Sequence, residues 1–255
     1  MLRDAHIHLD VIANGDELAA AGVPLLATSC EPAGYERLCD LSTSNANVHP
    51  ALGLHPWWIA GSDASEQERE RFEAELQHFL ELAPDVGFIG EVGLDFYGQY
   101  AATKQEQLAA FQCVAQALSG GGKVISLHTR NATGAALDAL EEYGVLSCCT
   151  CILHGFNGSS TEMTRAMSGG CFFSVGAREL KTKRWKEYAR QLPAGRLLLE
   201  TDAPWTALSP GDSESFEVTV EEWQASLQRA LELLNSIRQV DMTGAIEENL
   251  LRVLS

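Results

Sequence analysis

Two histidines near the start of the chain have the spacing of metal ligands. His6 and His8 stand in the run DAHIH at residues 4–8, which has the composition of a short strand. Side chains alternate along a strand, so both imidazoles are expected to point to the same face. Two neutral imidazoles that converge on one point supply half of the ligands of a metal ion. The other half would have to come from elsewhere in the chain.

Further residues of metal-ligating types share one sequence context, because each lies at the end of an apolar run that reads as a strand. They are His55, Glu91, Asp95, His128, His154 and Asp202. A single histidine in such a place is usually a hydrogen-bonded core residue. Here, however, five of the seven histidines lie at predicted strand ends. The other two, His49 and His78, are expected to be structural or solvated.

The elements that would position these residues alternate along the chain. The apolar runs predict strands at residues 4–8, 23–28, 48–54, 86–94, 123–128, 146–154, 170–175 and 196–200, and helical patterns cover 65–82 and 104–118. Strands that alternate with helices indicate parallel βαβ units, and eight of them predict a closed (β/α)8 barrel, the TIM-barrel class of α/β fold. Two amphipathic helices at 219–237 and 245–254 are expected to cover the barrel's outside or bottom. The chain, 1–255, is predicted to be a single domain.

In a barrel of this kind the carboxyl ends of the strands meet at one mouth, where active sites form. Four histidines, Glu91 and Asp202 are too many donors for one tetrahedral ion, so the set suits two metals. Glu91 comes from the middle of the strand order and is the natural bridge between the two ions. Asp202, from the last strand, should lie beside His6 and His8, where it could bind an ion and accept a proton from water.

The charge of the chain restricts its partners. The formal net charge is −17, which argues against sequence-blind coating of DNA but not against an enzyme that brings cations to a phosphate. Basic residues cluster in one segment, 178–190. This segment could be a solvated helix face or a rim that attracts a polyanion. Its members are Arg178, Lys181, Lys183, Arg184, Lys186 and Arg190.

Other features indicate an intracellular setting. No run of about 18 apolar residues predicts a membrane span, and the first residues do not have the apolar stretch of a signal peptide, so a cytoplasmic location is expected. The chain has seven cysteines, without the spacing of a disulfide framework. Cys148, Cys149 and Cys151 are expected to be reduced residues of a buried strand.

Six motifs together resemble one known family, the TatD family of metal-dependent DNases, which belongs to the amidohydrolase-like barrel superfamily. In order along the chain they are DAHIHLD (4–10), GLHP (53–56), GEVGLDFY (90–97), LHTR (127–130), HGFNGS (154–159) and ETDAPW (200–205). Each motif is weak alone, but the ordered set is specific for the family. The resemblance implies a (β/α)8 barrel that hydrolyses phosphodiester bonds of DNA with two divalent metal ions.

The resemblance also implies particular roles. One metal would bind His6, His8, Glu91 and Asp202, and the second would bind Glu91, His128 and His154. His55 and Arg130 are implied to be active-site residues that contact substrate phosphate. The catalytic set is therefore Asp202, Glu91, His55 and Arg130. The imidazole-rich donors favour Zn, Mn or Co, whereas the family is usually described as working with Mg. The expected partner is DNA, single-stranded or at its ends, and the expected state is a monomer.

Some alternatives stay open. Relatives usually carry Arg and Asn-x-Pro after the ETDxP motif, whereas residues 205–216 contain neither Arg nor Asn, so the substrate could differ. The chain could instead hydrolyse a small amide, lactone or ester, or bind metal without catalysis. The pair Trp57-Trp58 could stack on a base or pack beneath its loop, and Asp95 could orient a ligand or cap the next segment.

Overall fold

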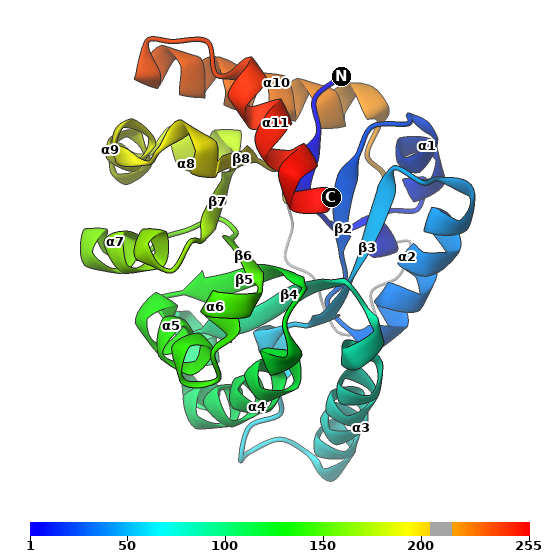
Figure 1. Cartoon of the computed structure of the whole chain (residues 1–255). Helices are drawn as coiled ribbons and strands as arrows, with labels where there is room; N and C mark the ends of the chain where they lie inside the picture. The colour runs from blue at the N-terminus through cyan, green and yellow to red at the C-terminus, as the bar shows by residue number, and fades with distance from the viewer. Residues whose placement is uncertain (205–215) are drawn as a thin grey trace.

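Eight parallel strands form a barrel with the helices around its outside (Figure 1). The structure is a computed structural model that describes residues 1–204 and 216–255. Each strand pairs with the next one in sequence. The predicted (β/α)8 fold is therefore confirmed. The strands are β1 (Asp4–Ile7), β2 (Leu25–Thr28), β3 (Val48–Leu54), β4 (Phe88–Asp95), β5 (Val124–Arg130), β6 (Thr150–Leu153), β7 (Phe172–Val175) and β8 (Leu197–Leu199).

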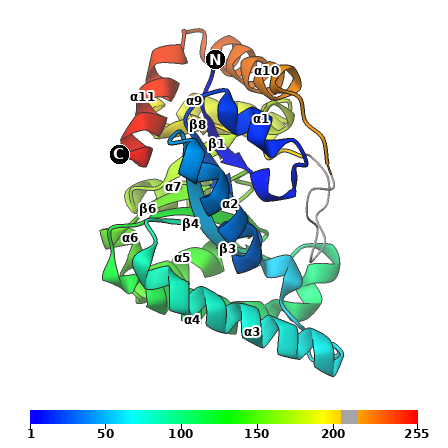
Figure 2. The ribbon, with the colours of Figure 1, turned by 90° about the vertical axis from the view of Figure 1, so that its right-hand side faces the viewer.

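The helices occupy the connections between strands and the C-terminal part of the chain (Figure 2). They are α1 (Gly15–Ala20), α2 (Pro32–Ser44), α3 (Glu66–Leu82), α4 (Lys104–Ala117), α5 (Thr133–Glu142), α6 (Val145–Cys148), α7 (Ser160–Ser168), α8 (Ala177–Leu180), α9 (Lys183–Gln191), α10 (Val220–Arg238) and α11 (Thr243–Leu254). Short 3-10 turns lie at Leu9–Val11, Pro56–Trp58, Ala83–Asp85, Gly98–Thr103, Leu118–Gly120 and Ala194–Arg196.

Polar side chains fix where the longer helices begin. Ser65 caps α3, and the Ser65 hydroxyl accepts from Glu68 N–H while the Glu68 carboxylate accepts from Ser65 N–H. The same reciprocal arrangement begins α10 at Thr219. Such boxes satisfy the backbone donors that a helix start leaves unpaired. The helices predicted over 65–82 and 219–237 therefore begin within one residue of the predicted positions.

The barrel closes between its first and last strands. Asp202 N–H donates to the carbonyl oxygen of His6 at 2.9 Å, and His8 N–H donates to the carbonyl oxygen of Ala203 at 3.0 Å. The buried Asp4 carboxylate reinforces this seam, since it accepts from Thr201 N–H at 3.0 Å and from Trp223 Nε1 in α10 at 2.8 Å. Closure brings the end of the chain's first strand beside the end of its last.

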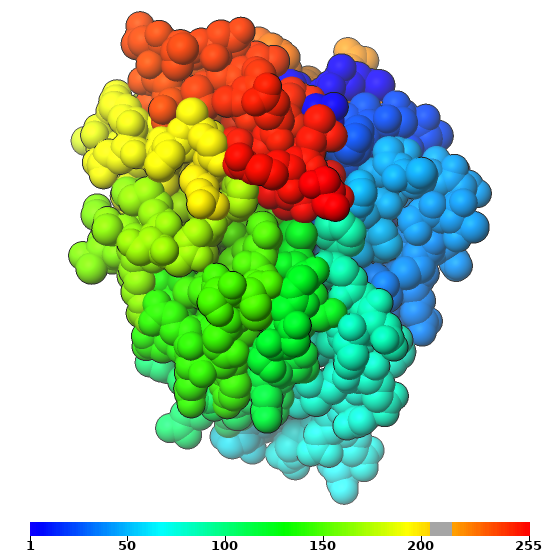
Figure 3. Space-filling model, viewed as in Figure 1, coloured from blue at the N-terminus to red at the C-terminus, as the bar shows by residue number. Residues whose placement is uncertain are grey.

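The C-terminal helices cover the barrel where they were predicted to. Leu250 and Val253 of α11 pack into a buried cluster with side chains that point into the barrel, among them Ala5 and Leu198. In Figure 3 α11 (red) lies on the surface between the segments coloured yellow and blue. The helix therefore closes the amino-terminal end of the barrel and leaves the opposite end, where the strands finish, to form the mouth.

One predicted strand is wrong over its first half. Residues 146–149, predicted as the start of a strand, belong to α6 and its cap, and β6 begins only at Thr150. Gly144 adopts a left-handed φ of 72°, which ends α5 and turns the chain into this short helix. As a result Cys148 is exposed and Cys149 half-buried, so the prediction of core cysteines is wrong for these two and right for the buried Cys151. All seven cysteines are free.

Three further expectations concern particular segments or residues. The altered stretch at 205–216 lies, apart from Phe216, outside the described residues. Among the described helices, none combines the length and apolar character that crossing a bilayer requires. His78, expected to be solvated, has a side chain that is 40% exposed.

Candidate metal centre and active site

The predicted donors meet at the carboxyl end of the barrel, around one cavity of about 670 Å³. His6, Glu91 and His128 lie in β1, β4 and β5, whereas His8, His55 and His154 directly follow β1, β3 and β6, and Asp202 lies after β8. The predicted site residues that line the cavity are His8, His55, Glu91, His128, Arg130, His154 and Asp202. His6 is completely buried beneath them.

Three donor atoms form the first compact group. The Nε2 atoms of His6 and His8 are 3.3 Å apart, and they lie 3.4 Å and 3.3 Å from Oε2 of Glu91. Ligands held about 2.0–2.1 Å from a tetrahedral ion are roughly 3.4 Å from one another. The spacing of these three atoms therefore fits one metal ion between them. Oδ1 of Asp202 is slightly farther, 3.9 Å and 3.8 Å from the same two nitrogens.

The opposite ring nitrogens of this pair are held by hydrogen bonds. Nδ1 of His8 is 3.1 Å from the carbonyl oxygen of Thr28. Because a carbonyl only accepts, this bond places the proton of a neutral imidazole on Nδ1 and leaves the Nε2 lone pair free for a ligand. Nδ1 of His6 contacts the hydroxyl of Ser126 at 2.8 Å. Hydrogen bonds of this kind orient metal-binding histidines.

The other oxygen of Glu91 faces a second group of histidines. Oε1 is 2.7 Å from Nδ1 of His128 and 3.5 Å from Nε2 of His154. Glu91 is only 2% exposed. Burial alone would raise the pKa of Glu91, but the surrounding histidines outweigh it and hold the pKa well below 4.5. An ionised carboxylate thus lies between two imidazole groups with one oxygen on each.

His55 lies closer to this centre than a residue that only contacts substrate would need to. Its side chain is buried, and Nε2 is 3.5 Å from Oε1 of Glu91. His55, Glu91 and His128 together form a group that could hold an ion. Burial lowers the pKa of His55 to about 4, and Trp57 N–H donates to Nδ1. The ring of His55 is therefore neutral, with its Nε2 toward Glu91.

Two carboxylates lie behind the second group. Asp95 contacts Nε2 of His128 at 3.1 Å, and it also accepts from Trp57 Nε1 at 2.6 Å and from Tyr97 N–H at 2.8 Å. Asp95 therefore contacts a histidine of the centre and also accepts from the backbone just after β4. Burial would raise the pKa of Asp95, but these hydrogen bonds lower it.

The second carboxylate, Glu200, was not singled out from the sequence. Its Oε2 lies 3.1 Å from Nδ1 of His154, and it also accepts from the Ser174 hydroxyl and from Gly155 N–H. Glu200 is 1% exposed. One feature of the sequence could have identified Glu200, which lies at the end of β8, two residues before Asp202. A buried carboxylate at such a place needs a partner.

Asp202 lies in the wall of the cavity with a side chain that is 29% exposed. Its backbone has a φ of 56°, a conformation that few residues other than glycine adopt. Burial raises the pKa of Asp202 to about 6, against the lowering effect of His154 and His8. A carboxylate that titrates near neutrality is suited to accept a proton. Nη2 of Arg178 lies 3.6 Å from its Oδ2.

The rim of the cavity carries arginines and aromatic rings. Arg130 is half-buried and its guanidinium stacks over the ring of Tyr97 at 3.8 Å. Arg178 and Arg184 are the two members of the basic segment that line the cavity. Trp57 also lines it and stacks on Tyr100 with ring centroids 5.0 Å apart. Two residues of the basic segment, Arg178 and Arg184, therefore lie on the rim of the cavity.

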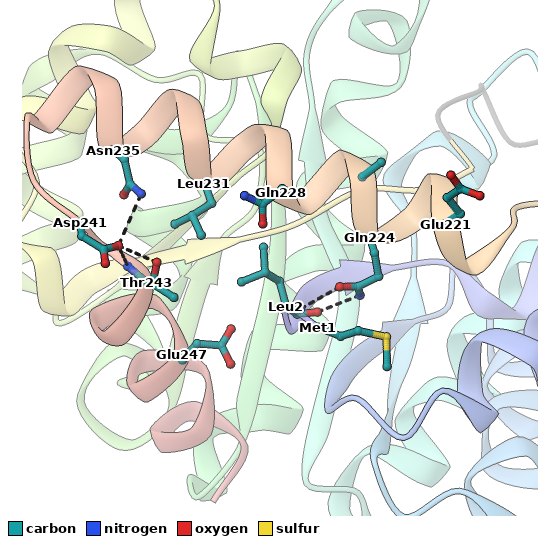
Figure 4. A pocket seen from close by; sticks show the side chains of 11 residues that line it. Met1, Leu2, Glu221, Gln224, Gln228, Leu231, Asn235, Asp241, Thr243 and Glu247 are labelled. Carbon is teal, nitrogen blue, oxygen red and sulfur yellow. Dashed lines mark hydrogen bonds between the residues drawn. The ribbon is translucent and has the colours of Figure 1, made fainter.

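A second depression lies at the opposite end of the molecule, between α10, α11 and the first residues of the chain (Figure 4). Gln224 of α10 binds the backbone of Leu2 there through two hydrogen bonds. Its carboxylates, Glu221, Asp241 and Glu247, belong to α10, α11 and the turn between them rather than to strand ends. The chemistry of the predicted site is therefore concentrated at the mouth.

A parallel barrel with histidines and carboxylates gathered at the carboxyl ends of its strands is the arrangement of a metal-dependent barrel hydrolase. A family model described as TatD related DNase matches residues 3–255. The chain belongs to this family, and the resemblance found in the six motifs is confirmed.

Individual relatives agree. The chain is 26% identical over 264 residues to the human protein named Deoxyribonuclease TATDN3, with 96% of this chain and 90% of that protein covered. It is 29% identical over 199 residues to a Citrobacter koseri protein named 3'-5' ssDNA/RNA exonuclease TatD, covering 77% and 72%. The crystal structure of the TatD homologue YjjV from Escherichia coli superposes with a TM-score of 0.68 at 24% identity, covering 99% and 95%. This likeness supports the same barrel fold.

Proposed function

We propose that this protein is a deoxyribonuclease that hydrolyses phosphodiester bonds with two divalent cations bound at the mouth of the barrel. The observation that carries the proposal is the placement of Glu91, whose Oε2 faces His6 and His8 while Oε1 faces His128 and His154. A carboxylate with one oxygen toward each imidazole group suits a bridge between two ions. The names of relatives that act on DNA support the choice of substrate.

The ligand assignment follows the two groups. His6, His8, Glu91 and Asp202 would hold one ion, and Glu91, His128 and His154 would hold the other. His55 lies within 3.5 Å of the same Glu91 oxygen as His154. Because its Nδ1 accepts from Trp57 N–H, the neutral ring carries its proton on Nε2 and suits a contact to phosphate. Bound divalent cations would supply Lewis-acid stabilisation of phosphate charge and a lowered pKa for water. Mg, Mn and Zn are the candidate ions.

The protein's own groups would perform the remaining tasks. Asp202, at the cavity wall 3.8–3.9 Å from the nitrogens of His6 and His8, would accept the proton of the attacking water. Arg130 lies at the cavity wall with its guanidinium held over Tyr97, where its charge can stabilise the phosphoryl oxygens. Single-stranded DNA or a DNA end is the proposed substrate, because the donors line a cavity instead of an open surface. A monomer in the cytoplasm is the proposed state and location.

The decisive experiment compares Glu91→Gln with the unaltered protein. The amide retains the size of Glu91 but cannot hold two cations, so we expect bound metal to fall and hydrolysis of single-stranded DNA to be lost while the circular-dichroism spectrum stays the same. Glu36→Gln, a change at a side chain that is 67% exposed, serves as the control and should retain both properties. A Glu91→Gln variant with full activity would remove the bridging assignment.

A further inference from the structure

The basic segment contributes two charges to the cavity, and their neighbours define what they can bind. In a chain with a net charge of −17, Arg178 of α8 and Arg184 of α9 line the same cavity as Arg130 of β5. The carboxylates of that cavity are Glu91, Glu179, Glu200 and Asp202. The arginines therefore stand on the rim of an otherwise acidic cavity.

Arg184 is held in place by the backbone and not by a carboxylate. Its Nη1 donates to the carbonyl oxygen of Asn157 at 2.6 Å. The side chain of Asn157 in turn accepts from Asn131 N–H at 3.2 Å, and Asn131 directly follows Arg130. This chain of hydrogen bonds ties Arg184 to the residue that directly follows Arg130 at the end of β5. Within the described residues Arg184 forms no ion pair, and a guanidinium has five donors, so several remain for a ligand.

Unlike Arg184, Arg178 has its charge partly offset by carboxylates of the cavity. Its side chain is 74% exposed, its Nε donates to Glu179 at 2.8 Å, and its Nη2 lies 3.6 Å from Asp202. Glu179 and Asp202 offset part of its charge. Arg184 therefore carries the less compensated positive charge, whereas Arg178 lies beside the proposed catalytic carboxylate.

We propose that Arg184, assisted by Arg178, binds a phosphate adjacent to the one that is cleaved. This inference rests on the proposed function and adds to it a preference for oligonucleotides over substrates with one phosphodiester. A guanidinium suits phosphate because its planar set of donors matches two phosphate oxygens. A substrate without a neighbouring phosphate would reach the metal centre but leave Arg184 unused.

The test compares Arg184→Gln with Arg190→Gln on two substrates. Arg190 is an arginine of the same helix, is 50% exposed, pairs with Glu187 and is not among the residues that line the cavity. An oligothymidylate carries neighbouring phosphates, whereas thymidine 5'-(4-nitrophenyl phosphate) has the same sugar and base with one phosphodiester. Both are assayed with added Mn²⁺.

For Arg184→Gln we expect kcat/KM to fall about tenfold on the oligothymidylate, as loss of one charged hydrogen bond would cause, and far less on the nitrophenyl ester. The plot of log kcat/KM against log salt for the oligothymidylate should become less steep by about 0.7, the value for one phosphate contact on a single strand. Arg184→Lys should recover part of both effects, and Arg190→Gln should leave both substrates unaffected.

Equal losses of Arg184→Gln on both substrates, or a salt slope identical to that of Arg190→Gln, would overturn the inference and leave the proposed function standing. If the unaltered protein hydrolyses neither substrate, the proposed function fails. Fluorescence anisotropy of a labelled oligothymidylate, which needs no turnover, then still tests Arg184: unchanged affinity and salt slope in Arg184→Gln would reject it.

Discussion

Glu200 lies behind His154, with its Oε2 3.1 Å from the ring Nδ1 and its other oxygen on Gly155 N–H at 3.0 Å. The carboxylate fixes the orientation of the imidazole, and its charge favours a proton on Nδ1, so that Nε2 faces Glu91. Burial would lower the pKa of His154, but the charges of Glu200 and Glu91 raise it well above 6.5. In the proposed centre, Glu200 would therefore control how well His154 binds a cation without touching the cation itself.

Glu200→Gln is expected to weaken metal binding or activity by about 10- to 100-fold, the usual effect of removing a partner behind a metal-binding histidine. The amide preserves the size of the side chain but loses its charge. Isothermal titration with Mn²⁺, together with turnover at saturating metal, separates the two effects. Ser174→Ala removes only one hydrogen bond to Glu200 and should cost less. A normal metal titration together with unchanged turnover in Glu200→Gln would contradict the assigned role.

Trp57 is expected to act through Asp95, because its Nε1 donates to the carboxylate that contacts His128. Trp57→Phe keeps an aromatic ring against Tyr100 and removes the donor, so kcat/KM should fall by roughly fivefold, the effect of about 1 kcal/mol. In the Asp95→Asn background the same substitution should have little further effect. If Trp57 instead served mainly to stack on a base, Trp57→Phe would retain activity and Trp57→Ala would lose it.

The positions of the strand-end donors could be predicted from the sequence because two simple rules determine them. The alternation expected for residues 4–8 predicts His6 and His8 on one face, and the two rings do meet although β1 ends at Ile7. The barrel rule gathers strand ends at one mouth. The division of Glu91 between two histidine groups follows from the same strand order. These features depend on spacing and topology, both of which the sequence carries.

Other features depend on three-dimensional contacts that spacing does not encode. Glu200 points at His154 from a different strand, and Nδ1 of His8 is fixed by a carbonyl of β2. The separation of Arg178 and Arg184 from the rest of the basic segment depends on how α8 and α9 pack. The helix α6 was missed because its apolar residues resemble a buried strand, and the left-handed Gly144 that starts it is one glycine among many.

Acid should weaken α7 through Glu162. Its carboxylate accepts from Ser159 N–H at 2.7 Å, and also from Gly134 N–H at the start of α5 at 2.8 Å. Burial would raise the pKa of Glu162, but these hydrogen bonds outweigh it and lower the pKa below 4.5. A lowered folded-state pKa gives stability that is present above about pH 4.5 and lost as the pH falls through the folded value. Glu162→Gln should therefore lower the free energy of unfolding at pH 7 by roughly 0.5 kcal/mol, because the amide can still accept these hydrogen bonds and solvent screens the lost charge.

The urea midpoint measured from pH 7 to pH 4 checks this prediction. The difference between Glu162→Gln and the unaltered protein should narrow as the pH falls, because protonation removes the charge that the substitution has already removed. Glu248→Gln, at an exposed position of α11, is the matched control and should follow the unaltered protein throughout. A difference that stays constant with pH would indicate that the carboxylate charge does not contribute.

Cations are expected to stabilise the fold, because the donors come from strands at opposite ends of the sequence and an unfolded chain cannot hold them together. Binding to the folded state alone adds RT ln(1 + [M]/Kd), about 2.7 kcal/mol when the free metal is at 100 times Kd. Adding Mn²⁺ to chelator-treated protein should raise Tm accordingly, and EDTA should reverse the effect. Glu91→Gln should lose most of this increment because both groups share Glu91, while His78→Gln, outside the centre, should retain it. An equal increment in both variants would place the stabilising cation elsewhere on the protein.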